Sequence, residues 1–165
     1  MIDLNNLNIK IFLDTANLDK IKNLLTNYPF IKGFTTNPSL MHKEGVKNYE
    51  EFCKEALNVS SNLPISFEVF SDDLKDMEEE ARIIHSWGGN SYVKIPISNT
   101  KGNSTSDVIS NLTKDGIKIN VTAIFTLEQI KEISRLPKFG FLDNNEYRKL
   151  IIVSDLVQHS NKLDL

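Results

Sequence analysis

Seven polar side chains fall at alternate positions of five short β-rich segments, a spacing that could build a catalytic site. The set holds one lysine, two carboxylates, two amides and two hydroxyls: Lys94, Asp14, Glu68, Asn37, Asn120, Thr35 and Thr122. Alternate residues of a strand face the same side of a sheet, so these side chains are predicted to share one face. Lys94 stands inside the apolar run "SYVKIPIS", where an unpaired ammonium ion would be costly to bury. The agreement of the five segments favours a functional site over an isolated lysine that reaches the surface.

These residue types predict Schiff-base chemistry. Burial disfavours an ammonium ion, and the neutral amine of a buried lysine can attack a carbonyl carbon. The carboxylates of Asp14 and Glu68 would supply the proton transfers that such a reaction needs. A pair of carboxylates would also suit a glycosidase, but that reading leaves Lys94 without a role. Because the set contains neither His nor Cys, a transition-metal site is not expected.

The segments that carry these residues alternate with helix-like segments. The predicted strands are "IKIFLDT" (9–15), "IKGFTTN" (31–37), "PISFEVF" (64–70), "SYVKIPIS" (91–98) and "KINVTAIF" (118–125). After the third strand, apolar residues at helical spacing run to Gly88-Gly89, and after the fifth strand "TLEQ" (126–129) fits a capping box. The connection 38–62 is the longest, and it is predicted to hold an extra turn before its helix. Such alternation predicts an α/β fold with a parallel sheet.

Two α/β architectures compete, an open doubly wound sheet and a (β/α)8 TIM-type barrel. No strand is followed by the glycine-rich phosphate fingerprints of the open-sheet class. The polar face lies mostly near the carboxyl ends of the strands, where a barrel builds its active site. We therefore expect a barrel. Because the fold commonly needs about 200–250 residues, it is expected to be incomplete here, with five to six β-α units.

Composition narrows the class of protein. The 165 residues carry a net charge of −3 and 40% hydrophobic residues, which is typical of one globular domain. The absence of a basic cluster argues against nucleic acid as a partner, and no apolar run or amino-terminal signal predicts a membrane segment. The single cysteine, Cys53, falls on an apolar helical face and is predicted to pack in the core. A cytoplasmic, single-domain protein is expected.

With these residues in place, the sequence resembles the transaldolase family, particularly its small bacterial members and the related fructose-6-phosphate aldolases. The resemblance runs from about Ile9 to Ile133 and rests on "FLDTAN" (12–17), "GFTTNPSL" (33–40), "ISFEVF" (65–70), "YVKIPIS" (92–98) and "INVTAIF" (119–125). It implies transfer of a dihydroxyacetone unit from a ketose phosphate (sedoheptulose 7-phosphate or fructose 6-phosphate) to an aldose phosphate, in the pentose phosphate pathway. The imine would serve as electron sink, so the resemblance implies neither a metal nor an organic cofactor.

The resemblance also assigns roles by position. Lys94 matches the Schiff-base lysine, and Asp14 matches the general acid/base at the substrate hydroxyl. Glu68, together with Thr122, matches the pair that positions the catalytic water. Asn37, Asn120 and Thr35 match residues that bind the substrate. The aldolase branch carries glutamine where Glu68 stands, and "NVT" (120–122) is the transaldolase form, so transfer is favoured over aldol cleavage.

The chain departs from the family pattern after about residue 133. We expect one barrel domain over 1–165, with 134–165 divergent, through truncation, a frame shift or a shortened variant. "FGFLD" (139–143) could be a sixth strand, and 147–157 a helix or a buried strand. The family's serine-plus-arginine segment for substrate phosphate is not identifiable. A fructose-6-phosphate aldolase-like lyase and an inactive binding or assembly module are the alternatives, and open sheet edges predict a homo-oligomer.

Overall fold

The computed structural model describes residues 10–136, so the sequence predictions for 139–143 and 147–157 lie outside the described residues. Strands and helices alternate along this part of the chain. Their order is β1 (Ile11–Asp14), α1 (Leu18–Asn27), β2 (Ile31–Thr35), α2 (Pro38–Lys43), α3 (Tyr49–Val59), β3 (Ile65–Glu68), α4 (Leu74–Ser86), β4 (Ser91–Pro96), α5 (Ser106–Lys114), β5 (Ile119–Thr122) and α6 (Leu127–Ser134).

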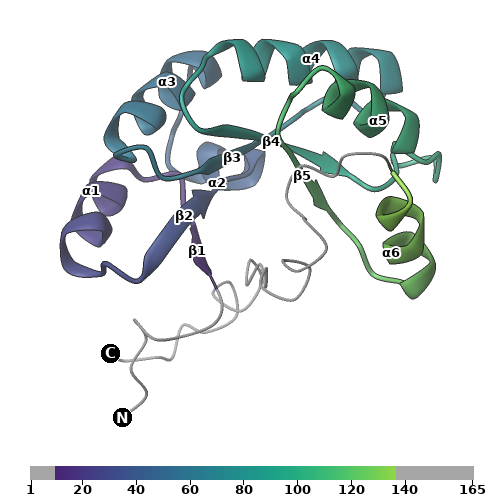
Figure 1. The fold of residues 1–165 in the computed structure, drawn as a ribbon. Helices are drawn as coiled ribbons and strands as arrows, with labels where there is room; N and C mark the ends of the chain where they lie inside the picture. The colour runs from purple at the N-terminus through teal and green to yellow at the C-terminus, as the bar shows by residue number, and fades with distance from the viewer. Residues whose placement is uncertain (1–9, 137–165) are drawn as a thin grey trace.

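The five strands form one parallel sheet in the order β1-β2-β3-β4-β5. A doubly wound sheet reverses its strand order at a switch point, whereas a barrel adds each strand beside the preceding one. Figure 1 shows the sheet arched, with α1, α3, α4 and α5 along its convex side. The fold is therefore α/β, and the five described strands form part of a (β/α)8-type barrel, as the sequence predicted.

The hydrophobic core lies between the convex face of the sheet and these helices. Phe67, Val93 and Ile95 point outward from the strands and are fully buried. Cys53 of α3 is buried in the same core, as its helical face predicted, and its neighbours in the core include Ala56, Met77, Ala81, Ile109 and Leu112. Alternation along the strands thus separates an apolar outer face from the polar inner face.

Side-chain caps fix where the helices begin. Asn37 accepts a hydrogen bond from the backbone N–H of Leu40 at 2.9 Å, and Asp73 caps α4 in the same way. Thr126 and Gln129 form the predicted capping box at the start of α6. In the long connection after β2, the predicted extra turn is the helix α2, which precedes α3.

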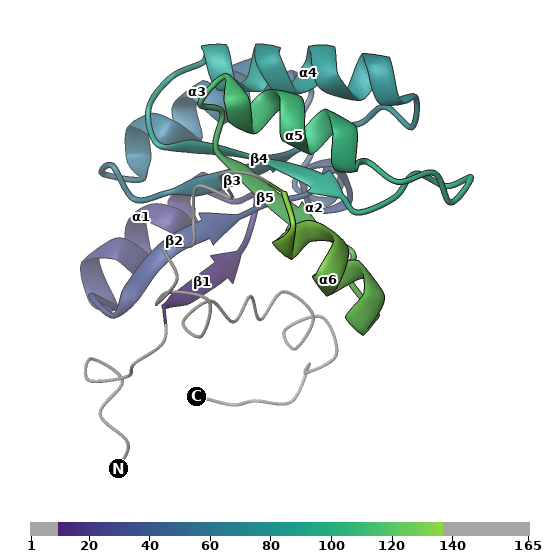
Figure 2. The ribbon, with the colours of Figure 1, turned by 45° about the vertical axis from the view of Figure 1, so that its right-hand side comes forward.

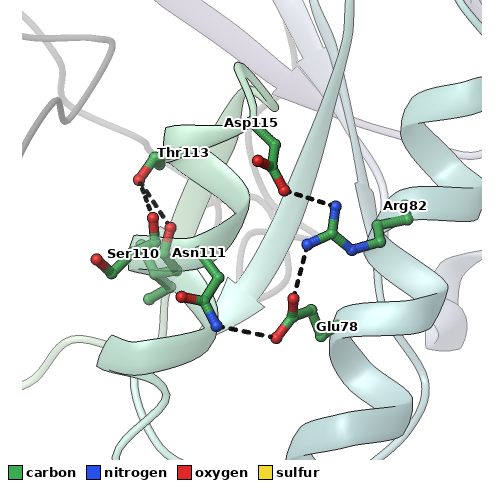
Figure 3. A network of polar contacts seen from close by, with 7 residues as sticks. Glu78, Arg82, Ser110, Asn111, Thr113 and Asp115 are labelled. Carbon is green, nitrogen blue, oxygen red and sulfur yellow. Dashed lines mark hydrogen bonds and ion pairs between the residues drawn. The ribbon is translucent and has the colours of Figure 1, made fainter.

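An ion-pair network joins α4 to the loop that follows α5 on the outer surface. The guanidinium of Arg82 donates to Glu78 at 2.7 Å and to Asp115 at 2.8 Å (Figure 3). The carboxylate of Glu78 also accepts from the Asn111 amide of α5. These contacts hold α4 and α5 side by side over β4 (Figure 2).

Close approach of two strands requires a glycine in β2. Gly33 is the register partner of Phe12 on β1. A Cβ atom at position 33 would overlap the Phe12 ring and would lie 2.7 Å from the carbonyl oxygen of Pro64. The absence of a side chain therefore lets the Phe12 ring occupy the inner face below the polar residues.

The fifth strand is shorter than the run 118–125 suggested. It ends at Thr122, because Ala123 adopts a left-handed backbone conformation with φ of 58°. Residues other than glycine rarely adopt this conformation, and it ends the alternation of the strand. Ala123, which strict alternation would place on the outer face, consequently lies beside the polar face with Ile124 and Phe125.

Candidate active site

A cavity of about 780 Å³ opens at the carboxyl ends of the strands. This is the end of a parallel barrel where active sites are built. Strand residues supply its polar part and the segments that follow β2, β3 and β5 supply its rim. The lining residues are Asp14, Asn37, Pro38, Ser39, Glu68, Val69, Phe70, Lys94, Pro96, Val121, Thr122, Ala123, Ile124 and Phe125.

Lys94 lies on β4 with its side chain directed to the inner face of the sheet. The residue is buried, with 8% of its surface exposed, and its amine lies 3.2 Å from Glu68 Oε2. The amine also donates a hydrogen bond to the backbone carbonyl of Thr36 at 3.2 Å. The buried amine is therefore paired with a carboxylate and a carbonyl, which offsets the cost of removing it from water.

The register of the sheet places Glu68 and Asn120 on either side of Lys94. Glu68 of β3 and Asn120 of β5 are both Cα partners of Lys94 on the central strand, β4. Side chains at paired positions of adjacent parallel strands point to the same face. Glu68 therefore reaches Lys94 without any distortion of the strand, and its half-buried carboxylate keeps access to the cavity.

Asp14 marks the carboxyl end of β1 and is held by β2. Its carboxylate accepts a hydrogen bond from the hydroxyl of Thr35 at 2.7 Å and one from the amide of Asn37 at 3.2 Å. Asn37 uses its amide oxygen to cap α2, so its NH₂ group is turned toward Asp14. The helix cap and the carboxylate together fix the orientation of the Asn37 side chain.

The remaining predicted residues lie on β5. The amide of Asn120 donates to the hydroxyl of Ser66 at 3.1 Å, and Thr122 lines the cavity opposite Pro96, its register partner. Thr35 and Asn120 are not among the residues that line the cavity. Their side chains form hydrogen bonds with Asp14 and Ser66 on the inner face of the sheet. All seven residues are thus on the predicted face, and Asp14, Asn37, Glu68, Lys94 and Thr122 line the cavity.

Several contacts at the site were not predicted from the sequence. The hydroxyl of Tyr49, from α3, donates a hydrogen bond of 2.7 Å to the backbone carbonyl of Glu68. Burial, and then the nearby Cys53, raises the pKa of Tyr49, so its hydroxyl remains a donor. Phe70 and Phe125 expose their rings at the rim of the cavity. Local sequence patterns carry no signal for the Tyr49 contact, because it depends on the packing of α3 against β3.

Within residues 10–136, no cluster of three or more His, Cys, Asp or Glu side chains is arranged to hold a metal ion. In the same part of the chain, none of the helices has both the length and the apolar character needed to span a membrane. His42 and His85 lie on α2 and α4, outside the residues that line the cavity, while His159 is outside the described residues.

Comparison with known proteins agrees with the geometry. Residues 11–147 match the family model described as transaldolase/fructose-6-phosphate aldolase. The chain is 39% identical over 163 residues to a probable transaldolase of Thermoanaerobacter sp. (strain X514), covering 95% of this chain and 72% of the relative. It is 32% identical over 156 residues to a probable transaldolase of Dehalococcoides mccartyi, and this match covers 90% of this chain and 69% of the relative. A probable transaldolase 2 of Listeria monocytogenes is 40% identical over 121 residues, 73% of this chain and 52% of the relative.

Proposed function

Given that this chain belongs to the transaldolase/fructose-6-phosphate aldolase family, we propose that it transfers a dihydroxyacetone unit between sugar phosphates through a Schiff base at Lys94. One observation carries the proposal. A buried lysine amine lies 3.2 Å from a carboxylate, inside a cavity at the carboxyl ends of parallel strands, and Asp14 lines the same cavity. This is the arrangement that amine attack followed by proton transfer requires.

The reaction begins at the carbonyl carbon of the ketose donor. Lys94 first passes a proton to Glu68, and its amine then attacks this carbon; Glu68 returns the proton as the hydroxyl leaves as water, which gives the protonated imine. Glu68 is close enough to the Lys94 amine to exchange protons with it directly, and a water held between Glu68 and Thr122, which line the same cavity, would serve as a relay. The carboxylate therefore serves both the formation and the hydrolysis of the imine.

Cleavage follows at the C3–C4 bond. Asp14 takes the proton of the C4 hydroxyl, the bond breaks, and its electron pair moves into the imine to give an enamine on Lys94. The aldose leaves, and an acceptor aldose then reacts with the enamine in the reverse sense. Thr35 and Asn37 hold the Asp14 carboxylate in place for both directions, since each donates a hydrogen bond to one of its two oxygens.

Glu68 supports transfer rather than simple aldol cleavage. A carboxylate can accept a proton from a bound water, whereas the side-chain amide of glutamine cannot. A coupled assay tests the proposal with fructose 6-phosphate as donor and erythrose 4-phosphate as acceptor. Transfer predicts formation of sedoheptulose 7-phosphate that depends on the acceptor. Release of free dihydroxyacetone without an acceptor would indicate an aldolase, and no turnover of either kind would contradict both.

We also propose that the protein acts in the cytoplasm and self-associates. Within residues 10–136, the outer strands β1 and β5 each have a strand neighbour on one side. Next to β5, Phe125 and Leu127 are largely exposed, at 85% and 69%. Unpaired strand edges and exposed apolar side chains favour association with a second copy. Light scattering tests this, and a stable monomer at all concentrations would contradict it.

A further inference from the structure

The carboxyl end of β3 is held by two helices at the point where it carries Glu68. On one side, the hydroxyl of Tyr49 at the start of α3 donates to the backbone carbonyl of Glu68 at 2.7 Å. On the other side, the Glu80 carboxylate of α4 accepts from the backbone N–H groups of Phe70 at 2.7 Å and Ser71 at 3.0 Å. Glu80 also accepts from the Ser71 hydroxyl at 2.6 Å.

The sequence explains why the Glu68 carbonyl is open to a side chain. Between β2 and β3, the N–H of Thr36 donates to the carbonyl of Ser66. Continuing this parallel ladder by one repeat would pair the N–H of residue 38 with the carbonyl of Glu68. Residue 38 is a proline, which has no N–H, and the chain there turns into α2. The Tyr49 hydroxyl thus replaces a ladder hydrogen bond that the backbone cannot make.

Aromatic packing fixes the Tyr49 ring itself. The ring meets Phe70 edge-on, with centroids 4.7 Å apart, and meets Trp87 in the same manner at 5.3 Å. Phe70 in turn lines the cavity two residues beyond Glu68. The hydroxyl contact with Glu68 and the ring contact with Phe70 therefore act on the same four-residue segment, 68–71.

From these contacts we infer that Tyr49 is a positioning residue, which sets the Glu68 carboxylate against the Lys94 amine for proton transfer. The inference rests on the proposed function. The Tyr49 hydroxyl bonds to the backbone carbonyl of Glu68, so it acts on the Glu68 carboxylate indirectly, through the strand end. Proton transfer needs hydrogen-bond reach, and a misplacement of about 1 Å can cost a rate factor of about 100.

Tyr49→Phe is the direct test, because it keeps the ring contacts and removes the hydroxyl. We expect kcat to fall by at least about tenfold with little change in KM, and the pH–rate profile to change with it. Tyr28→Phe is the matched control. Tyr28 is exposed and lies after α1, just before the start of β2, whereas Glu68 lies at the carboxyl end of β3, so removing the Tyr28 hydroxyl should leave kcat unchanged.

A double-mutant cycle separates positioning from general destabilisation. If Tyr49 acts through Glu68, Tyr49→Phe should have little further effect on kcat in a Glu68→Gln background. An equal fall in both backgrounds would contradict the inference, because a structural defect lowers activity whether or not the carboxylate is present. A wild-type chain without turnover would instead contradict the proposed function.

Crystal structures of the free wild-type and Tyr49→Phe proteins test the inference independently of activity. The variant should show the Glu68 carboxylate moved away from the Lys94 amine, beyond the ion-pair limit of about 4 Å. A carboxylate that stays at the wild-type position would overturn the inference even if the wild-type enzyme proves inactive.

Discussion

The side-chain amine of Lys94 lies 3.2 Å from the carboxylate of Glu68, and the two residues are register partners on adjacent strands. Their contact follows from the pairing of β3 with β4 and needs no loop to bring the groups together. Strands are rigid supports, so the distance between amine and carboxylate is set by the fold itself. The first prediction concerns this pair.

Glu68→Gln should slow Schiff-base formation and shift the reaction from transfer toward slow aldol cleavage. The amide of glutamine can still contact the amine but cannot accept a proton from water. We expect kcat for transfer to fall by about 100-fold or more, a loss typical for a general acid/base group. Transfer and cleavage are measured side by side over a range of pH. A variant with the pH–rate profile of the wild type would contradict the assigned role.

Thr36→Val should stabilise the fold. Thr36 is 1% exposed, and within the described residues its hydroxyl oxygen has no hydrogen-bond partner. An unsatisfied buried hydroxyl costs about 1–3 kcal/mol, so a methyl group in its place should raise the free energy of unfolding by about 1 kcal/mol. Thr113→Val is the matched control, because the buried Thr113 hydroxyl donates to the carbonyl of Ile109 at 2.8 Å. The control should lower the free energy of unfolding, and equal effects in urea denaturation would contradict the explanation.

Stability should decline in alkaline solution through Cys53. Burial raises the pKa of the Cys53 thiol well above its ordinary value of about 9. The thiol then ionises first in the unfolded chain, so its stabilising effect is complete below pH 9 and is lost as the pH rises toward the folded pKa. Each such group removes up to about 1.4 kcal/mol of unfolding free energy per pH unit.

Cys53→Ala isolates this effect. The variant loses packing at every pH, but its unfolding free energy should decline less between pH 9 and 10.5 than that of the wild type under reducing conditions. Tyr49, whose pKa burial also raises, contributes to the decline in both proteins at the upper end of this range. The same decline in the variant and in the wild type would show that the Cys53 thiol does not titrate as its burial requires.

Much of the fold was predictable because its signals are local. The alternation of apolar and polar residues in the strands, the helical spacing around Cys53 and the Thr126–Gln129 capping box each lie within a few residues. Five strand ends with polar side chains then located the inner face, since parallel strands present equivalent ends at the same edge of the sheet. Lys94 was informative because its charge contradicts the apolar run around it.

The remaining features depend on contacts that a local pattern does not encode. Tyr49 and Glu68 are 19 residues apart, and their contact needs α3 to pack against β3. The left-handed conformation of Ala123 is not a preference of alanine, so the end of β5 could not be placed from propensity. No sequence pattern points to Thr36, because its backbone carbonyl, and not its side chain, contacts Lys94.

Gly33→Ala should destabilise the barrel. The added methyl would overlap the Phe12 ring and would approach the Pro64 carbonyl to 2.7 Å. Overpacking of this kind commonly costs about 1–3 kcal/mol. We expect a smaller cost in a Phe12→Ala background, where the ring no longer blocks the methyl, and thermal unfolding of the four proteins measures the difference. Identical costs in the two backgrounds would contradict the close approach of β1 and β2.

The most direct test of the account is reductive trapping at Lys94. The protein is incubated with fructose 6-phosphate and borohydride, and the product is analysed by intact mass and peptide mapping. Lys94→Met is the control. It should remain folded, because methionine is similar in size to lysine and the Glu68 carboxylate, left without its partner, still faces the cavity. The account predicts that the wild type gains a covalent sugar adduct on Lys94 and that the Met variant gains none. A wild-type protein without an adduct, or one whose adduct maps to another lysine, would contradict it.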